Sequence, residues 1–413
     1  MNEILLKHRG IPDSHSMDVY ERNGGYSALK KALAMSPEEV IDRVYESGLR
    51  GRGGAGFPAG AKWKLLTKYR VKTVYIICNA DEGEPGTFKD RHIMEFDPHL
   101  LIEGMVIAAH ATGAHHGFIY LRGEYDWVER RLTAAIDEAL DGGMLGNNIS
   151  GSGFSFYIDI FRGAGSYVCG EETALIESIE GKAGRPRLKP PFPAAFGLYG
   201  EPTVIHNVTT LSFIPFIINE GPAAFKSLGK FKREGTKLFG ISGHVNNPGL
   251  YEYPMGTSLR ELIYEAAGGV REGKALKAVI PGGLSAPVLK TDEIDVDMDF
   301  QSLNAIGSML GSGGIIVLDE DTSIPLIAQK TAKFYAHESC GQCSPCREGT
   351  GMIKFLMDRV VTGEGTSKDI EQILRLCRYI KGSTICAFGV AATMPVATMI
   401  MKFREEFDAL LRE

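Results

Sequence analysis

TVYIICNADEGEPGTFKDR, residues 73–91, is the stretch that decides the fold. It begins with a nearly continuous apolar run, which is typical of a strand buried on both faces of a parallel sheet. Four polar residues follow the run: Asn79, Asp81, Glu82 and Glu84. Open α/β sheets bind their ligands just past the carboxyl ends of their strands. The stretch therefore predicts a central strand with a ligand site at its end.

Helix and strand patterns alternate on both sides of this stretch. Ser36 and Pro37, followed by two glutamates, are typical of a helix start and predict a helix to about residue 46. The other expected elements are a short helix at 61–70, a helix near 99–111, a strand at 117–123, a helix at 124–140, a strand at 154–161 and a helix at 171–180. This alternation predicts an α/β domain over residues 1–234, with a parallel sheet and helices on both of its faces.

The pattern changes from about Gly235. Two strand-like runs flank residues 246–249, which is typical of a hairpin, and a helix at 258–268 and strands at 277–283 and 314–321 follow. We expect a smaller, strand-rich domain over residues 235–325. Residues 368–380 and 402–413 carry apolar side chains at helical spacing with charges opposite, which predicts a helical bundle over residues 326–413.

Composition limits the class of protein. A chain of 413 residues is too long for one ordinary core, and its net charge of −6 does not favour nucleic acid as a partner. No stretch approaches the roughly 20 apolar residues of a spanning helix, and the N-terminus lacks the apolar run of a signal peptide. We therefore expect a cytoplasmic protein with no direct membrane insertion, linked to any membrane through other subunits.

Three of the seven cysteines lie on one short loop, as Cys340-x-x-Cys343-x-x-Cys346. Three thiolates on a tight loop with a distant fourth are typical of an iron-sulfur cluster. Structural zinc is the alternative, although zinc loops usually contribute cysteines in pairs. For the fourth ligand we favour Cys386, in the loop GSTICAFG, over Cys377, which is in phase with apolar residues on a helix and is expected to be a core thiol.

A glycine-rich loop, GLRGRGGAGFPAGAKW at residues 48–63, precedes the central strand. Its Gly51-x-Gly53-x-x-Gly56 spacing matches the dinucleotide fingerprint, but a helix stands before it where the fingerprint needs a strand. We favour a phosphate site formed with Arg52 and Lys62, and the alternative is a flexible surface loop.

A third loop, RGAGSYVCGEETA at residues 162–174, ends its own strand in the same crevice and brings Tyr167, Glu171 and Glu172. The carboxylates would accept hydrogen bonds from sugar hydroxyls and disfavour a 2′-phosphate, which favours NAD over NADP. The alternative role for Glu171 and Glu172 is stabilisation of the first turn of a helix.

The chain resembles the family of the flavin-bearing, NADH-oxidising subunit of respiratory complex I, also called the 51 kDa or F subunit. The resemblance rests on four long motifs in order: GLRGRGGAGFP at 48–58, CNADEGEPGTFKDR at 78–91, GSYVCGEETALIESIEGKAGRPRLKPPFP at 165–193 and ESCGQCSPCREGT at 338–350. It implies FMN in the α/β domain, a β-grasp domain of the soluble-ligand-binding (SLBB) kind in the middle, and a four-helix-type bundle holding a 4Fe-4S cluster.

The resemblance also assigns site residues. The cluster ligands would be Cys340, Cys343, Cys346 and Cys386. The NADH contacts would be Phe57, Glu84, Glu171, Lys189 and Phe192. The FMN contacts would be Gly51, Arg52, Gly53, Gly54, Gly56, Lys62, Asn79, Asp81, Glu82, Tyr167, Gly170, Glu172 and, on a later loop, Asn207. The chain departs from the family pattern at His206, where a second asparagine is expected, and at Leu65, where some relatives carry an aromatic residue.

The activity implied is hydride transfer from C4 of NADH to N5 of FMN, followed by single-electron steps to the cluster. Glu84 and Lys62 would orient the reactants and tune the potential, since this transfer needs no acid or base. The partners implied are a small 2Fe-2S subunit of the E type and a larger iron-sulfur subunit of the G type, in the peripheral arm of a membrane-associated complex.

Two other functions are compatible with the motifs. One is the diaphorase subunit of an NAD-dependent hydrogenase or formate dehydrogenase; such subunits often carry cysteine-rich extensions, and their absence here favours complex I. The other is a non-catalytic ligand-binding protein with a zinc-stabilised bundle.

Overall fold

Four parallel strands form the sheet to which residues 73–91 contribute. The computed structural model describes residues 3–66 and 73–412. The strands are β1 (Tyr75–Ala80), β2 (His116–Leu121), β3 (Tyr157–Arg162) and β4 (Thr203–Asn207). Their order is β3-β2-β1-β4, so the predicted central strand pairs on both sides, with Ile77 between Phe118 and Ile205. The sequence analysis missed β4 and placed Asn207 on a loop, which is wrong.

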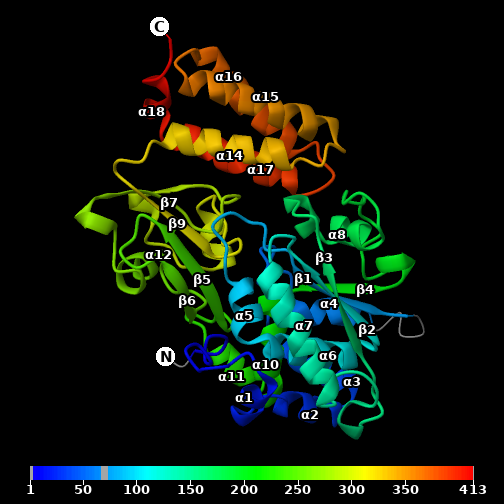
Figure 1. Ribbon diagram of the computed structural model, residues 1–413. Coiled ribbons are helices and arrows are strands. Elements are labelled where there is room, and N and C mark those ends of the chain that lie inside the picture. Colours follow the sequence, from blue (N-terminus) through cyan, green and yellow to red (C-terminus); the bar gives the residue numbers. More distant parts are fainter. Residues whose placement is uncertain (1–2, 67–72, 413) are drawn as a thin grey trace.

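Helices cover both faces of this sheet, but unequally (Figure 1). Ile76 and Cys78 point into the largest core, which the buried helix α6 (Pro98–Thr112) shares with the N-terminal helices and α7 (Asp126–Asp141). Ile77 points to the other face, where it packs with the apolar side of α8 (Glu172–Ile179). The prediction of helices on both faces is confirmed, with most of the buried area on one side.

Several shorter helices complete this part of the chain. Before β1 stand α1 (Met17–Arg22), α2 (Ser27–Leu33), α3 (Pro37–Glu46) and α4 (Ala59–Leu66), and later come α5 (Asp90–Phe96), α9 (Val208–Ser212), α10 (Ile214–Glu220) and α11 (Pro222–Ser227). The predicted start of α3 is confirmed, since Ser36 and Glu39 form a reciprocal capping box. The helix expected at 61–70 is present up to Leu66, and its last residues lie outside the described part of the chain.

A second sheet of mixed direction follows, with the order β6-β5-β9-β7-β8. Its strands are β5 (Thr236–Gly243), β6 (Gly249–Pro254), β7 (Leu276–Ile280), β8 (Leu289–Lys290) and β9 (Gly314–Asp319). β5 and β9 are parallel neighbours in the middle, and the other pairs are antiparallel. The short helices are α12 (Leu259–Glu261), continued by a π-helical turn at 262–266, and α13 (Phe300–Ala305). This is the expected mixed sheet, with five strands where about four were predicted.

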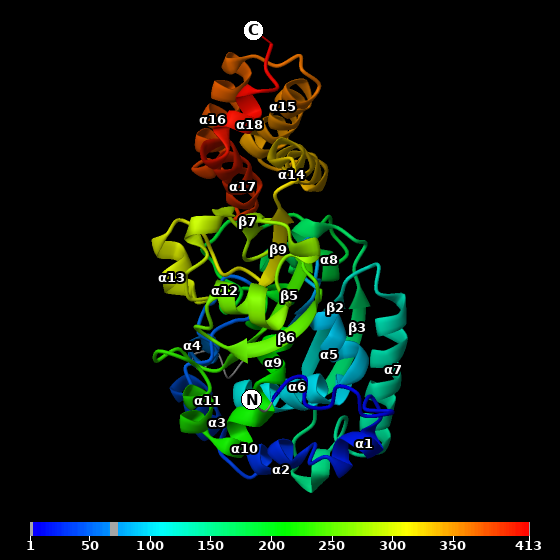
Figure 2. The same ribbon diagram turned by 90° about the vertical axis from the view of Figure 1, so that its left-hand side faces the viewer.

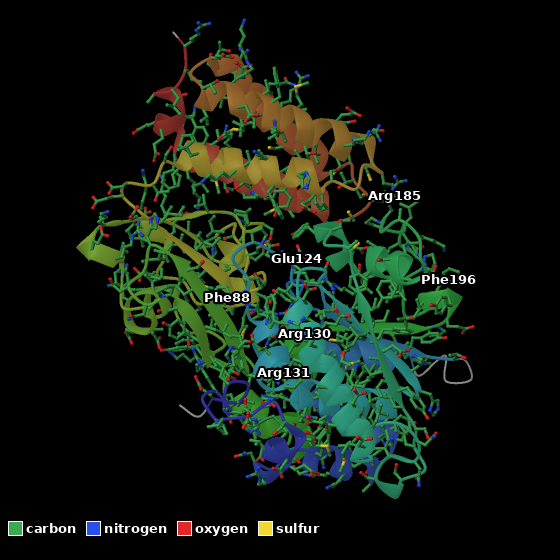
Figure 3. All side chains as sticks on the ribbon, viewed as in Figure 1. Phe88, Glu124, Arg130, Arg131, Arg185 and Phe196 are labelled. Carbon is green, nitrogen blue, oxygen red and sulfur yellow. The ribbon has the colours of Figure 1, made fainter. Side chains whose placement is uncertain are left out.

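The two sheets are in contact through Phe88, which follows β1 and lies toward the five-stranded sheet (Figure 3). A Cβ at Gly240 of β5 would stand 3.0 Å from the Phe88 ring, so the absence of a side chain there allows this close approach. The segment that decides the first sheet therefore also positions the second.

The end of the chain forms the predicted bundle, which stands on the side of the molecule opposite α1 and α2 (Figures 1 and 2). Its long helices are α14 (Ile324–Glu338), α15 (Ser344–Val361), α16 (Ser367–Lys381) and α17 (Phe388–Lys402). Residues 402–413 were expected to be a bundle helix, but they contain only the short α18 (Arg404–Asp408). The fourth long helix is α17, which contains Pro395 and is apolar on most sides, so it lacks the amphipathic pattern that predicts a helix. Across residues 3–66 and 73–412, no helix combines the length and the apolar character that crossing a membrane requires.

Replacement of Gly104 by alanine should destabilise the protein. Gly104 lies inside α6, and a Cβ there would stand 2.2 Å from the carbonyl oxygen of Leu211 in α9. We expect the free energy of unfolding to fall by about 1–3 kcal/mol because two buried helices must separate. The control is Gly351→Ala in α15, where nothing lies within 4 Å of the added Cβ and stability should rise by about 0.5–1 kcal/mol. Chemical denaturation of both variants measures this, and equal effects would contradict the contact.

Candidate functional site

The glycine-rich loop lies against the carboxyl edge of the parallel sheet. The backbone N–H of Arg52 donates to Thr210 Oγ1 at 2.8 Å, and a Cβ on Gly53 would stand 3.0 Å from Cβ of Asn207. Thr210 belongs to α9, which begins directly after β4. The loop therefore lies against the end of β4, beside the strand ends where the sequence predicts a ligand crevice.

Asn79 and Asp81 form the floor of the crevice at the end of β1. Asn79 Nδ2 donates to the carbonyl oxygen of Gly170 at 2.8 Å, which connects the β1 end to the loop after β3. Asp81 Oδ2 is buried and has no hydrogen-bond partner among the described residues. Burial raises the pKa of Asp81 to about 7, although Arg122 favours the charged form. A buried acceptor without a donor fits a ligand that brings hydroxyl groups.

Two lysines and two glutamates form a charged wall at the start of α8. Lys62 Nζ donates to Glu172 at 3.3 Å and to the carbonyl oxygen of Ile205 at 3.1 Å. Lys189 Nζ donates to Glu171 at 2.7 Å and to Glu172 at 2.8 Å. Burial opposes ionisation of Glu172, but Lys62 and Lys189 outweigh it and lower the pKa of Glu172. The wall thus keeps charged groups beside the crevice.

Glu171 also stabilises the first turn of a helix, which was the alternative role for Glu171 and Glu172. Its Oε2 accepts hydrogen bonds from the backbone N–H groups of Thr173 and Ala174, at 2.9 and 3.0 Å, and so caps α8. Its Oε1 remains available to Lys189. One carboxylate therefore both starts the helix and contributes to the charged wall.

Glu84 connects the loop after β3 to the domain of the five-stranded sheet. Tyr167, from the loop after β3, donates its hydroxyl to Glu84 Oε2 at 2.7 Å, and Ser285, after β7, donates its backbone N–H to Glu84 Oε1 at 2.7 Å. Burial raises the pKa of Glu84, while Tyr167 and Ser285 favour its charged form. Ser285 had no signal in the sequence, because its contact is 201 residues away along the chain.

Three of the predicted residues direct their side chains to other partners. Glu82 is buried, and its two oxygens accept from the backbone of Lys89, Asp90 and Arg91 and from the Tyr125 hydroxyl. The Arg52 guanidinium donates to the carbonyl oxygen of Glu234, on the side of the five-stranded sheet. The hydrogen bonds from the backbone of Lys89, Asp90 and Arg91 make the Glu82 side chain a cap for α5, and we withdraw Glu82 as a cofactor contact.

Asn207 is the third of these residues. It is the N-cap of α9, and its amide donates to Asp90 at 2.6 Å while its oxygen accepts from Lys89 at 3.2 Å. Lys89 and Asp90 are themselves buried and form an ion pair at 2.7 Å. Sequence reasoning missed this pair, since nothing in the motif marks a charged couple as buried. The Asn207 side chain is therefore held by this buried pair and by the start of α9.

The residues at the rim differ in exposure. Phe57 and Phe192 are 48% and 57% exposed, so both rings are free to stack on a planar ligand. Leu65, where some relatives carry an aromatic residue, is 46% exposed. His206 is instead buried, with its Nε2 2.7 Å from the Trp63 indole N–H that donates to it, and burial lowers its pKa to about 3. His206 is therefore a neutral part of the wall behind Lys62.

The cysteine loop lies between α14 and α15. Gly341 has a φ of +74°, which allows the chain to turn tightly between Cys340 and Cys343. Cys343 is the N-cap of α15, and Cys346 lies in the first turn of that helix. Burial raises the pKa of the Cys346 thiol, and the neighbouring Cys340 and Cys343 add to this shift.

Cys386 approaches the same place from the loop before α17. Cys343 and Cys386 pack against the apolar cluster that contains Cys346 and Phe388. Burial raises the pKa of Cys386 to about 11, with Cys340 and Cys343 adding to the shift. Cys377 is 3% exposed in a different core, so its expected role as a core thiol is confirmed. In the part of the chain that the structure describes, no three Cys, His, Asp or Glu side chains are close enough to hold a single metal ion.

Aromatic side chains connect the crevice to the cysteines. Tyr167 contacts the rings of Phe334, Tyr335 and Phe388, with centroids 5.4–5.9 Å apart. Its backbone N–H donates to Glu338 at the end of α14, at 2.9 Å. Glu338 is a second residue that the motifs did not single out, although it precedes the cysteine loop by two positions. The two candidate sites are therefore adjacent and share one residue.

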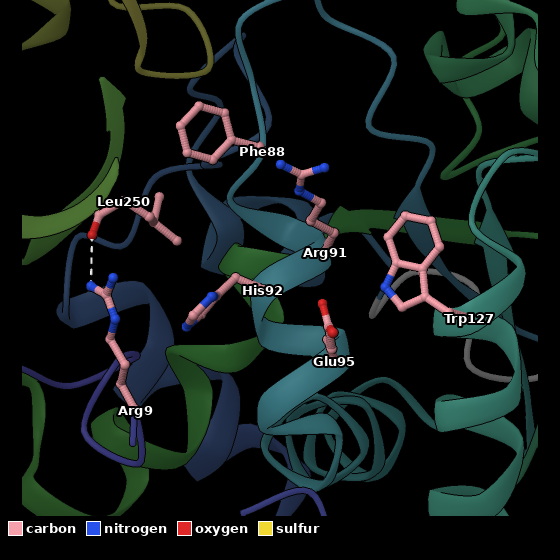
Figure 4. A pocket seen from close by; sticks show the side chains of 7 residues that line it. All are labelled: Arg9, Phe88, Arg91, His92, Glu95, Trp127 and Leu250. Carbon is pink, nitrogen blue, oxygen red and sulfur yellow. Dashed lines mark hydrogen bonds between the residues drawn. The ribbon is translucent and has the colours of Figure 1, made fainter. Parts of the chain in front are cut away.

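A cavity of about 420 Å³ lies elsewhere, between the N-terminal segment, α5, α7 and β6. Figure 4 shows Arg9, His92 and Trp127 around it, with Arg9 donating to the carbonyl oxygen of Leu250. It is lined by none of the predicted site residues.

Comparison with known proteins agrees with this arrangement. Three family models match in order: a Nuo51 FMN-binding domain at residues 44–216, an SLBB domain at 237–317 and an NADH-ubiquinone oxidoreductase-F iron-sulfur binding region at 326–410. The chain is similar in structure to an NAD⁺-reducing [NiFe]-hydrogenase in the H₂-reduced state, with a TM-score of 0.86 and 36% identity over 96% of this chain and 68% of that one. The air-oxidised form gives a TM-score of 0.84 and covers 67% of that chain.

Curated relatives match along nearly their whole length. An NADH-quinone oxidoreductase F subunit of Rhizobium meliloti (strain 1021), designated F 2, is 53% identical over 99% of this chain and 98% of the relative. The NADH-quinone oxidoreductase F subunit of Rickettsia rickettsii (strain Sheila Smith) is 50% identical over 97% and 95%. With the crevice, the mixed sheet and the cysteine bundle in the order of the three family models, the chain belongs to the family of NADH-quinone oxidoreductase F subunits.

Proposed function

We propose that this chain oxidises NADH in the crevice and delivers the electrons to a 4Fe-4S cluster in the bundle, as the electron-input subunit of an NADH-quinone oxidoreductase. The observation that carries the proposal is the adjacency of the two sites. Tyr167 binds Glu84 with its hydroxyl and packs its ring beside the aromatic residues around Cys346. FMN, when bound, accepts a hydride from NADH and gives up electrons one at a time.

The crevice residues fit FMN. Asp81 provides a buried acceptor without a partner in the described chain, which suits a ribityl hydroxyl. Gly51, Gly53, Gly54 and Gly56 of the glycine-rich loop are the proposed phosphate contacts, and Lys62, beside Glu172, is the proposed positive charge. Asn79 and Gly170 hold the two strand ends at a fixed separation. The further contacts proposed are Tyr167, Glu172 and the backbone of Arg52 and Asn207.

NADH would enter between the exposed rings at the rim. Phe57 and Phe192 offer aromatic faces to its bases, and Lys189, Glu171 and Glu84 provide the polar partners. Glu84 and Lys62 orient the reactants and hold no proton for transfer. Glu171 and Glu172 are already paired with Lys189 and Lys62, so the proposed preference for NADH over NADPH rests on the family alone.

Cys340, Cys343, Cys346 and Cys386 are the proposed ligands of the cluster. Four soft thiol donors are the usual ligand set of such a cluster, and all four of these cysteines are free thiols. The proposed domains are residues 1–234, 235–325 and 326–413.

The finer assembly is also a proposal. The family implies a small 2Fe-2S subunit of the E type and a larger iron-sulfur subunit of the G type, within a peripheral arm on the cytoplasmic side. Exposed apolar residues on the bundle support a partner there, with Met352 at 47%, Phe355 at 55%, Tyr379 at 62% and Met401 at 62% exposure.

The second candidate is the diaphorase subunit of an NAD-linked hydrogenase. The hydrogenase structures share this fold at 36% identity, whereas the quinone-linked relatives are 50–53% identical. The subunit composition of the native complex distinguishes these two functions. Anaerobic purification followed by flavin extraction and iron analysis tests both, because a colourless protein without iron would leave only a binding module.

Replacement of Cys386 by alanine should remove the cluster. The variant loses one of four proposed ligands, so we expect iron content and the low-temperature EPR signal of the reduced protein to be lost while FMN remains. The matched control is Cys377→Ala, which removes a thiol from a different core and should keep the iron. Iron retained in the first variant and lost in the second would reverse the assignment.

FMN binding should strengthen as pH rises through neutrality. The pKa of Asp81 is raised to about 7 in the protein without ligand, and only the charged carboxylate accepts hydrogen bonds with both oxygens. Protonation therefore weakens binding below about pH 7, by up to about tenfold per pH unit. The pH dependence of folding without ligand runs in the opposite direction. The contribution of Asp81 to the free energy of unfolding is fully present below its unfolded pKa and is lost as pH rises through about 7.

Fluorescence titration of apoprotein with FMN between about pH 6 and 8 measures this effect. Asp81→Asn should bind FMN more weakly and without this pH dependence. Asp137→Asn, an exposed position on α7, is the control and should retain the slope. A slope that survives in Asp81→Asn would assign the pH dependence to another group.

Replacement of Glu84 by glutamine should raise the KM for NADH while FMN stays bound. The change removes a negative charge at the junction of Tyr167 and Ser285, and we expect about a tenfold effect from the loss of one charged hydrogen bond. Steady-state kinetics with an artificial acceptor and the visible spectrum give the two readouts. Glu95→Gln, outside the crevice, is the control, and loss of flavin from Glu84→Gln would contradict the role.

A further inference from the structure

A cavity of about 620 Å³ lies on the far side of the glycine-rich loop, between the parallel-sheet domain and the five-stranded sheet. Its walls come from the end of α3, the start of the loop, the segment before β5 and the start of α13. Arg52 is the only predicted cofactor contact that also lines this cavity. Its volume lies within the range of small-molecule sites.

The lining of this cavity is predominantly basic. Five cationic side chains border it, against three carboxylates: Arg50, Arg52, Lys226, Lys232 and Arg233 against Glu46, Glu234 and Asp299. One carboxylate is neutralised directly, because Arg233 forms an ion pair with Asp299 at 3.0 Å. Lys226 and Lys232 are exposed and have no partner within residues 3–66 and 73–412. The cavity therefore carries an excess of positive charge.

Arg52 is a buried cation with unused capacity. It is 1% exposed, and its Nη2 donates to the carbonyl oxygen of Glu234 at 3.0 Å, while its Nε has no partner in the described chain. Burial lowers the pKa of Arg52 to about 10, even though Glu234 favours its charge. A buried guanidinium with a free N–H is costly unless an anion or another acceptor compensates it.

Arg50 makes one wall of this cavity rigid. Its Nε donates to the carbonyl oxygen of Gly56 at 2.7 Å, and its guanidinium stacks on the Phe300 ring at 4.2 Å from the centroid. One planar face and one edge are thereby held in place, and the remaining N–H groups are oriented in advance. Guanidinium groups held in this way recognise phosphate oxygens in pairs.

We propose that this cavity is a second anion site, separate from the cofactor crevice, which binds a small phosphorylated or pyrophosphate-bearing metabolite. Arg50 and Arg52 contact the phosphate oxygens from the buried side, and Lys226 and Lys232 contribute positive charge from the solvent side. Because Arg50 and Arg52 flank Gly51 at the start of the glycine-rich loop, an anion bound by both arginines would contact that loop directly.

Calorimetric titration of the FMN-loaded protein with inorganic pyrophosphate tests the site, with saturating NAD⁺ present to block the nucleotide crevice. We expect binding of one pyrophosphate per chain. The double variant Lys226→Gln/Lys232→Gln should weaken it by about tenfold or more, because it removes two charge-assisted contacts. The charge-preserving pair Lys226→Arg/Lys232→Arg should retain binding within about threefold, since arginine supplies the same charge.

The matched control removes two lysines far from the cavity. Lys368→Gln/Lys381→Gln on α16 lowers the net charge equally and should leave pyrophosphate binding unchanged. Equal weakening in both glutamine pairs would show a non-specific charge effect and overturn the proposal. Absence of pyrophosphate binding to the unmodified protein would overturn it as well.

Discussion

The junction at Tyr167 is the constraint on which the rest of the structure depends. Its hydroxyl holds Glu84 at the end of the central strand, its backbone holds Glu338 of the bundle, and its ring packs against Phe388. The backbone N–H of Ser285, which follows β7 of the mixed sheet, donates to the other carboxylate oxygen of Glu84. Because a buried carboxylate is costly without donors, these contacts oppose separation of the three parts. Electron transfer requires redox centres at a fixed separation, and this junction provides it.

Among the described residues at the strand ends, Asp81 Oδ2 is a buried acceptor without a hydrogen-bond partner. Glu171 and Glu172 are neutralised by Lys189 and Lys62, and these lysines keep Glu172 ionised despite its burial. Asp81 has no comparable partner, since the influence of Arg122 is too weak to offset burial. Charge is therefore nearly balanced around Glu171 and Glu172, whereas Asp81 Oδ2 lacks a hydrogen-bond donor among the described residues.

Local patterns predicted the elements that local chemistry determines. The capping box of α3, the apolar run of β1 and the cysteine loop each depend on residues within a few positions, so the sequence alone identifies them. Helix α17 was missed because it is apolar on most sides, and β4 because a strand of five residues carries little pattern. The roles of Glu82 and Asn207 depended on Lys89, Asp90 and Tyr125, whose positions only the tertiary fold supplies.

The glycine-rich loop has the glycine spacing of the dinucleotide fingerprint, but the structural reasons for its glycines are different. A Cβ on Gly53 would stand 3.0 Å from Cβ of Asn207 in β4, which is a tight contact, and a Cβ on Gly56 would stand 2.3 Å from the ring of Phe300, in α13 beside the mixed sheet. Gly56 also has a φ of +67°, which disfavours other residues. Neither reason is the tight strand-to-helix turn of the dinucleotide fingerprint. The loop thus has the glycine spacing of that fingerprint, but Gly53 and Gly56 are set by contacts on two sides of the loop, with Asn207 of β4 on one side and Phe300 of the neighbouring domain on the other.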